Sequence, residues 1–141
     1  HVVERSVRST TWRHYLELLA AYERLERLGR PLKAVVTPVV APRRAADGPL
    51  HGMSIAVKDM IDVEGHARGN GNPTAMAGEV ASEDSEVIRL LRDAGADILA
   101  LASLLEYAAG APHPDLPEAR NPRDPARTAG GSSGGSAALG H

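Results

Sequence analysis

Three absences limit what this sequence can encode. It contains no cysteine, which excludes disulfides, thiolate metal sites and a cysteine nucleophile. It contains no apolar run near the roughly 18 residues that a membrane-spanning helix needs. It also lacks an excess of positive charge, since 16 Lys and Arg stand against 18 Asp and Glu. The sequence therefore predicts no binding to nucleic acid and no membrane association.

Signals for a metal centre and for export are missing as well. The six histidines are scattered, and no pair has ligand spacing on an expected helix, so we expect no metal and no cofactor. The first ten residues, HVVERSVRST, interleave charged residues with apolar ones and have no apolar core behind them. This pattern is not that of a signal peptide. We therefore expect a cytoplasmic protein.

An amphipathic helix is expected near the start of the chain, within residues 7–29. From residue 11 to residue 28, apolar side chains recur at steps of three and four, with charged side chains between them. Ser9 or Thr10 can cap its start, and Gly29 can end it. The apolar positions are Trp12, Tyr15, Leu16, Leu19, Tyr22, Leu25 and Leu28.

The middle of the chain has the pattern of an α/β crossover unit. Residues 53–57 and 97–102 are short apolar runs typical of strands. Between them, residues 84–94 place apolar side chains on one helical face and end at Gly95. A strand, a long loop, a helix and a second strand, in this order, predict two parallel strands.

Less regular segments surround this unit. Residues 32–40 favour a short strand or extended segment, because Pro38 interrupts an otherwise β-forming run. An exposed loop is expected at residues 43–49. From Gly110 onward the chain is rich in proline and leads into a Gly/Ser loop. A long loop of this kind inside an α/β domain is more often functional than idle.

The Gly/Ser loop is the first candidate site. In TAGGSSGGSAALGH, residues 128–141, two glycine pairs flank Ser132 and Ser133, and a helix-forming run of small residues follows at once. Glycine lets another group approach the backbone closely. A linker or an anion-binding turn is the alternative interpretation. A Walker-type phosphate loop is excluded, because no Lys follows the last glycine of the motif.

Lys58 is the second candidate, because it directly follows the apolar run that ends at Val57. A strand-end lysine that pairs with Asp59, Asp62 or solvent is the alternative. A serine hydroxyl needs a base to act as a nucleophile, and a neutral lysine is a recognised substitute for histidine. Its pKa would have to fall from about 10.4 to about 7–8. Burial at the end of an apolar strand could supply this shift.

Four blocks of the sequence together resemble the amidase signature family. They are GPLHGMSIAVKDMIDVEG, DSEVIRLLRDAGADILA, LEYAAG and RNPRDPARTAGGSSGGSAALG, and they extend from Gly48 to Gly140. Their order and spacing agree with the family. The resemblance implies a mixed sheet flanked by helices, and it identifies residues 1–141 as the N-terminal portion of a single amidase domain that ends before the nucleophile.

The resemblance also implies a Ser–Ser–Lys triad. Lys58 falls on the catalytic lysine, and Ser132 falls on the serine that relays a proton between the lysine and the nucleophile. Ser133 falls on a supporting serine, and the bond between Gly131 and Ser132 falls on a cis peptide. This bond would turn the Ser132 hydroxyl toward Lys58, within hydrogen-bond distance. The acyl-forming serine lies a couple of dozen residues further on in the family, so no nucleophile is expected in this chain.

Three functions follow from the resemblance. The first is amide hydrolysis through a serine acyl-enzyme in the complete protein, with a small-molecule amide as substrate and with this chain inactive by itself. The second is the A subunit of an aminoacyl-tRNA amidotransferase, which would have partner subunits. The third is a non-catalytic, truncated pseudo-enzyme.

Overall fold

The computed structural model describes residues 2–39 and 48–140, with side chains of α1 from residue 13 onward. Its elements are α1 (Val2–Gly29), β1 (Val35–Pro38), β2 (Ser54–Lys58), α2 (Pro73–Met76), α3 (Glu86–Asp93), β3 (Asp97–Ala102), the 3-10 helix η1 (Glu106–Ala108) and α4 (Gly134–Leu139). Of the loop expected at residues 43–49, residues 43–47 lie outside the described part of the chain.

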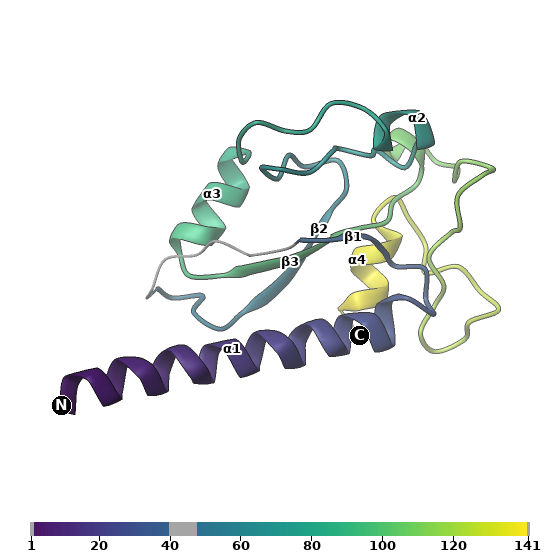
Figure 1. Ribbon diagram of the computed structural model, residues 1–141. Coiled ribbons are helices and arrows are strands. Elements are labelled where there is room, and N and C mark those ends of the chain that lie inside the picture. The colour runs from purple at the N-terminus through teal and green to yellow at the C-terminus, as the bar shows by residue number, and fades with distance from the viewer. Residues whose placement is uncertain (1, 40–47, 141) are drawn as a thin grey trace.

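The three strands form one mixed sheet in the order β1-β3-β2. β2 and β3 are parallel and β1 is antiparallel to β3, so the crossover unit expected from the sequence is confirmed. β3 is the central strand and all six of its residues are buried. β2 lies at an edge of the sheet, because no other strand in the described part of the chain pairs with its far side. The α/β fold with helices on both sides of a mixed sheet is therefore as predicted (Figure 1).

The two faces of the sheet have separate apolar cores. α3 covers one face, where Ile88 packs with Val57 and Ile98. α1 and α4 cover the other face, where Leu25 and Leu139 pack with residues of β3 such as Leu99 (Figure 1). Side chains along a strand alternate between the two faces. This alternation decides which face receives each polar residue at the end of β2.

The N-terminal helix is longer than predicted. It begins at Val2 and not at residue 7 or 11, and Ser9 and Thr10 lie inside it and do not cap it. The physical reason is that no Gly or Pro interrupts the first 28 residues, so the helix continues until Gly29. A β-carbon at Gly29 would lie 2.6 Å from the side chain of Val35, so this glycine also lets the helix end pack against β1. Trp12 lies outside the described side chains.

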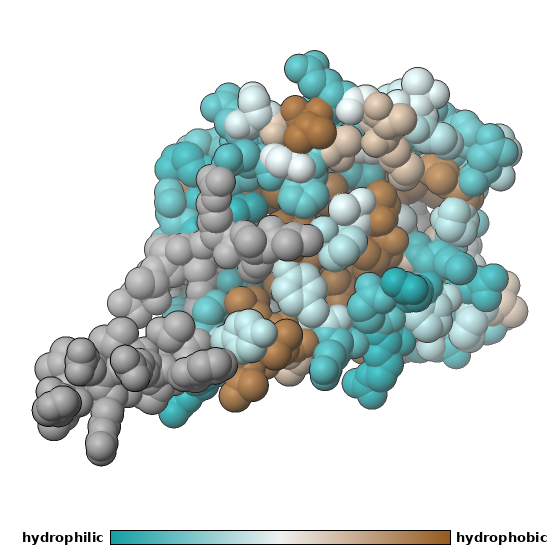
Figure 2. Space-filling view, viewed as in Figure 1, coloured by the Kyte–Doolittle hydropathy of each residue, from teal (hydrophilic) through white to brown (hydrophobic). Residues whose placement is uncertain are grey.

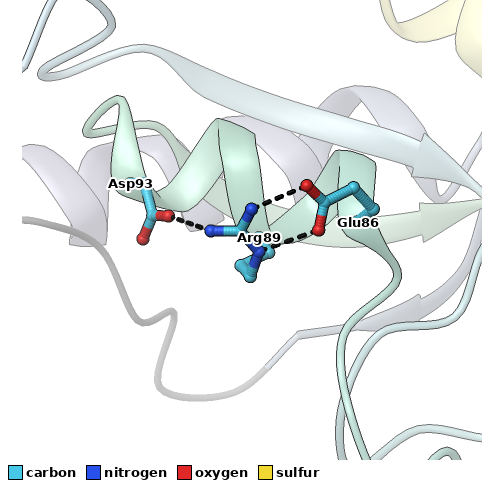
Figure 3. Close-up of polar contacts among 3 residues, drawn as sticks. All are labelled: Glu86, Arg89 and Asp93. Atoms are coloured by element: carbon cyan, nitrogen blue, oxygen red, sulfur yellow. Dashed lines mark hydrogen bonds and ion pairs between the residues drawn. The ribbon is translucent and has the colours of Figure 1, made fainter.

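α3 begins at Glu86, two residues later than predicted, and ends before Gly95, whose φ of +95° only glycine adopts readily. Asp84, the first residue of the predicted helix, lies before it, accepts the Glu64 N–H at 2.8 Å and pairs with Arg92 at 3.1 Å. On the solvent face, Arg89 donates to Glu86 and Asp93 across single turns of the helix (Figure 3). α3 is thus apolar toward the sheet and ion-paired toward solvent.

Part of the apolar surface remains uncovered. Apolar side chains gather in the middle of the visible face, between α1 and the elements above it (Figure 2). On α1, Leu16 is 61% exposed and Leu19 is 42% exposed. A cavity of about 640 Å³ lies between α1, α4 and β2. None of the helices in the described part of the chain is long and apolar enough to cross a membrane.

Candidate active site

Lys58 is the last residue of β2, and its direction is set by the hydrogen bonds around it. The Asp59 N–H donates to the Ala102 carbonyl at 3.0 Å and so extends the ladder with β3 by one residue. The N–H groups of Met60 and Ile61 both donate to the Lys58 carbonyl, at 2.7 and 3.1 Å. A tight turn therefore follows Lys58 directly. Alternation along β2 places its side chain on the same face as Ala56, which packs in the core with α1 and α4.

Ser132 is held by a short loop that needs its glycines. Gly130 has a φ of +82°, and the peptide bond between Gly131 and Ser132 is cis, as the resemblance implied. A β-carbon at Gly131 would lie 2.7 Å from Cγ of Leu105. The Leu105 N–H donates to the Ser132 carbonyl at 3.1 Å. Leu105 therefore contacts this loop through both its side chain and its backbone.

Gly135 brings the start of α4 against the end of the sheet. Its N–H donates to the Ser103 carbonyl at 2.9 Å, just after β3. A β-carbon at Gly135 would lie 2.5 Å from the Ala34 carbonyl oxygen and 2.7 Å from that of Ser103. Only glycine permits so close an approach of two backbones. Because β2 and β3 are parallel and neighbouring, this packing brings the serine loop next to the end of β2.

The two candidate side chains meet there. Lys58 Nζ donates to Ser132 Oγ at 2.7 Å, although the residues are 74 positions apart in the sequence. This contact confirms the predicted hydrogen bond. The alternative ion pair of Lys58 with an aspartate is not formed, because Asp59 accepts a hydrogen bond from Gly69 and Asp62 pairs with Arg68. Both Lys58 and Ser132 are half-buried, so the pair is partly shielded from water and still open to a reacting group.

Ser133 does not join this contact. It occupies the position before α4, makes no side-chain capping bond and is exposed. Its carbonyl accepts the N–H of Ala137 at 3.0 Å. The structure thus brings together Lys58, Gly131 and Ser132, and it leaves the Ser133 side chain facing solvent. The 640 Å³ cavity is lined by neither Lys58 nor Ser132.

Asp59 is a feature of the site that the sequence suggested only as a partner for Lys58. Asp59 is 1% exposed. Burial raises the pKa of Asp59 to about 6, and the hydrogen bond from the Gly69 N–H lowers the pKa by a smaller amount. A carboxylate directly after a strand-end lysine was the available signal. Its burial depends on the loop that folds over it, and this loop has no periodic pattern.

No group of three or more His, Asp or Glu side chains that could hold a metal ion occurs among the described side chains, those of residues 13–39 and 48–140. The chemistry that this arrangement offers is proton transfer between a lysine amine and a serine hydroxyl. A hydroxyl at this distance from an amine can give its proton to the amine and accept one from a further group.

Comparison with known proteins identifies the family of this chain. The family model described as Amidase matches residues 32–139, which include both Lys58 and Ser132. An amidase of Pseudomonas putida is 49% identical over 84 residues, which are 59% of this chain and 17% of that protein. The A subunit of the glutamyl-tRNA(Gln) amidotransferase of Aromatoleum aromaticum is 37% identical over 130 residues, which are 82% of this chain and 26% of that protein.

Solved structures give the same result. The A subunit of the glutamyl-tRNA(Gln) amidotransferase of Thermotoga maritima aligns with a TM-score of 0.77 and 28% identity, over 86% of this chain and 27% of that one. The peptide amidase of Stenotrophomonas maltophilia aligns with a TM-score of 0.70 and 27% identity, over 93% of this chain and 31% of that one. The chain therefore spans about a quarter of the length of the relatives that it matches, and it belongs to the amidase family.

Proposed function

We propose that the full-length protein hydrolyses amides through a serine acyl-enzyme, and that Lys58 and Ser132 are two members of its Ser–Ser–Lys triad. The observation that carries this proposal is the 2.7 Å contact between Lys58 Nζ and Ser132 Oγ. It joins the end of β2 to a loop whose glycines, Gly131 and Gly135, pack closely against Leu105 and the end of the sheet. The match of the family model over residues 32–139 supports the same reaction.

In the proposed mechanism, the neutral amine of Lys58 is the base. It takes a proton from the Ser132 hydroxyl while Ser132 takes the proton of the acyl-forming serine, which attacks the amide carbonyl. The same pair then returns a proton to the leaving amine or ammonia. In the hydrolysis of the acyl-enzyme, the pair takes a proton from the attacking water and returns one to the acyl-forming serine. The separation of 2.7 Å suits proton transfer from Ser132 to Lys58 and from Lys58 to Ser132, because either heavy atom can act as the hydrogen-bond donor.

The remaining parts of the site are assigned by resemblance. The acyl-forming serine and the backbone N–H groups of the oxyanion hole belong to a segment downstream of this sequence. Gly131 shapes the approach to Ser132, and Ser133 supports the proton relay through hydrogen bonds once the rest of the site is present. The 141-residue chain by itself is accordingly proposed to be inactive toward amides.

A second candidate function is that of an amidotransferase A subunit. Relatives of 37% to 40% identity are named as the A subunits of glutamyl-tRNA(Gln) amidotransferases, and this name favours a role in which released ammonia passes to a partner subunit. The relay of Lys58 and Ser132 would be the same in both cases. The two functions differ in the fate of the ammonia, which is released to solvent by a hydrolase and delivered to a second substrate by an amidotransferase.

The test uses turnover of a small aryl or aliphatic amide by the full-length protein. Ser132→Ala and Lys58→Ala should each lower kcat by about 10²–10⁴-fold, because each breaks the proton relay. Ser136→Ala is the matched control, since it removes a half-buried hydroxyl from α4 without touching the Lys58 contact. Full turnover in Ser132→Ala or Lys58→Ala would refute the triad. Ammonia transfer that appears only with partner subunits would identify the amidotransferase.

A further inference from the structure

Asp59 makes an unusual set of contacts for a buried acidic residue. Its Oδ1 accepts the N–H of Gly69 at 3.1 Å, and its backbone carbonyl accepts the N–H of Asn70 at 2.7 Å. Its own N–H is bonded to the Ala102 carbonyl in β3. Asp59 therefore ties the end of β2 to β3 on one side and to the loop at residues 69–70 on the other.

Gly69 contacts the Asp59 carboxyl at a position where a β-carbon has no space. Its φ is not in the left-handed region, so the requirement for glycine is one of space. A β-carbon at Gly69 would overlap Asp59 Oδ2 and would lie 2.7 Å from the side chain of Met76. The carboxyl of Asp59 and the backbone of Gly69 are therefore packed as one unit.

The loop at residues 69–72 continues the connection toward Ser132. The Asn70 carbonyl accepts the N–H of Tyr107 at 2.8 Å, and Asn72 Nδ2 donates to Glu106 Oε1 at 2.6 Å. The adjacent residue, Leu105, donates its N–H to the Ser132 carbonyl. A chain of hydrogen bonds thus runs from Asp59, through the loop and η1, to the serine that contacts Lys58.

We propose that the Asp59 carboxyl is a positioning group, which holds both partners of the Lys58–Ser132 contact through its hydrogen bond with Gly69. It acts on Lys58 through the adjacent peptide at the end of β2, and on Ser132 through the loop at residues 69–72 and Leu105. It lies on the opposite face of the strand from Lys58, so it takes no part in the proton relay. This inference rests on the proposed function of that relay.

We call the hydrogen bond between the Asp59 carboxyl and the Gly69 N–H the clamp. The clamp needs a hydrogen-bond acceptor at residue 59, and it does not need a negative charge there. Oδ2 has no hydrogen-bond partner among the described residues, so the one bond that matters is accepted by Oδ1. Asparagine keeps an oxygen in the place of Oδ1, whereas alanine removes it. The two substitutions at Asp59 therefore separate the clamp from the charge.

Steady-state kinetics of the full-length protein provide the first test. Asp59→Ala should lower kcat by about 100-fold with KM unchanged, the size of effect expected when a reacting pair is misplaced by about 1 Å. Asp59→Asn should retain kcat within a few fold. Val63→Ala is the control, because Val63 is a buried apolar residue of the core beneath α3, and this variant should lower Tm and retain kcat. If Asp59→Ala does not fold, Gly69→Ala replaces it and should show the same loss of kcat.

Hydrogen exchange provides the second test, and it does not depend on activity. The Leu105 amide should exchange faster in Asp59→Ala than in the wild type or Val63→Ala. Unchanged exchange, full kcat in Asp59→Ala, or equal losses in Asp59→Ala and Asp59→Asn would overturn the clamp. If the proposed function is wrong, Lys58→Ala and Ser132→Ala will retain turnover. The hydrogen-exchange result for the Leu105 amide still tests the role of Asp59 in that case.

Discussion

The stability of this protein should depend on pH through Asp59, and Asp59→Asn should remove that dependence. The side chain is 1% exposed, and its charged form accepts only one hydrogen bond, from Gly69. Burial therefore favours the protonated form and raises the pKa of Asp59 from 3.8 to about 6. Asparagine has nearly the same shape and stays neutral at every pH in this range.

The sign and size of the effect follow from this shift. Well below pH 3.8 the carboxyl is protonated in both the folded and the unfolded protein, so burial carries no charge penalty. Between pH 3.8 and about 6 the folded protein binds more protons than the unfolded one, and its stability falls as pH rises. The difference between the two pKa values corresponds to about 3 kcal/mol, at about 1.4 kcal/mol for each unit.

The assay is urea denaturation of the full-length wild type and Asp59→Asn at pH 3.5 and pH 8. The variant should gain about 3 kcal/mol relative to the wild type between these two pH values. The cost of burying the asparagine amide does not depend on pH and cancels in this double difference. Asp115→Asn, which changes an exposed carboxylate, is the control. Parallel pH dependences for wild type and Asp59→Asn would refute the reasoning.

Three other changes test the packing around the site. Gly135→Ala should destabilise the protein by about 1–3 kcal/mol and lower turnover, because the new methyl group meets the carbonyls of Ala34 and Ser103; an unchanged Tm would contradict this. Arg89→Ala should leave both Tm and turnover unchanged, since its ion pairs with Glu86 and Asp93 lie on the solvent face of α3. A clear decrease in Tm or turnover would show that these exposed ion pairs contribute to stability or activity. The 141-residue chain by itself should associate, because the edge of β2 and the apolar side chains of α1 are open. A concentration-independent monomer in sedimentation, with a sharp and reversible unfolding transition, would argue against this.

Much of the fold was predictable because its signals are local. The apolar period of the N-terminal helix, the two apolar runs of β2 and β3 and the stop at Gly95 depend on residues only a few positions apart. The errors were at element ends. α1 begins five residues before the earliest predicted start, and α3 begins at Glu86. In α3 the predicted first residue, Asp84, lies before the helix and pairs with Arg92 in its last turn.

The candidate site divides in a similar way. Lys58 at a strand end and Ser132 between glycine pairs are visible in the sequence, because a charged residue after an apolar run and a cluster of four glycines are both unusual. The expectation that the two side chains touch came from the resemblance, and the 2.7 Å contact agrees with it. The importance of Asp59 was not predictable, since its burial depends on Gly69 and its connection to Ser132 depends on Leu105.

The sequence by itself indicated the N-terminal helix, the two apolar strands and the helix between them, and it made Lys58 and Ser132 the candidate site residues. Only the tertiary structure decided that β3 lies between β1 and β2, that α4 packs on the end of the sheet through Gly135, and that Asp59 is buried behind Lys58. The physical reason is the range of the interactions. Periodicity and turn signals act over a few residues, whereas these contacts join segments far apart in the chain and depend on how its layers pack together.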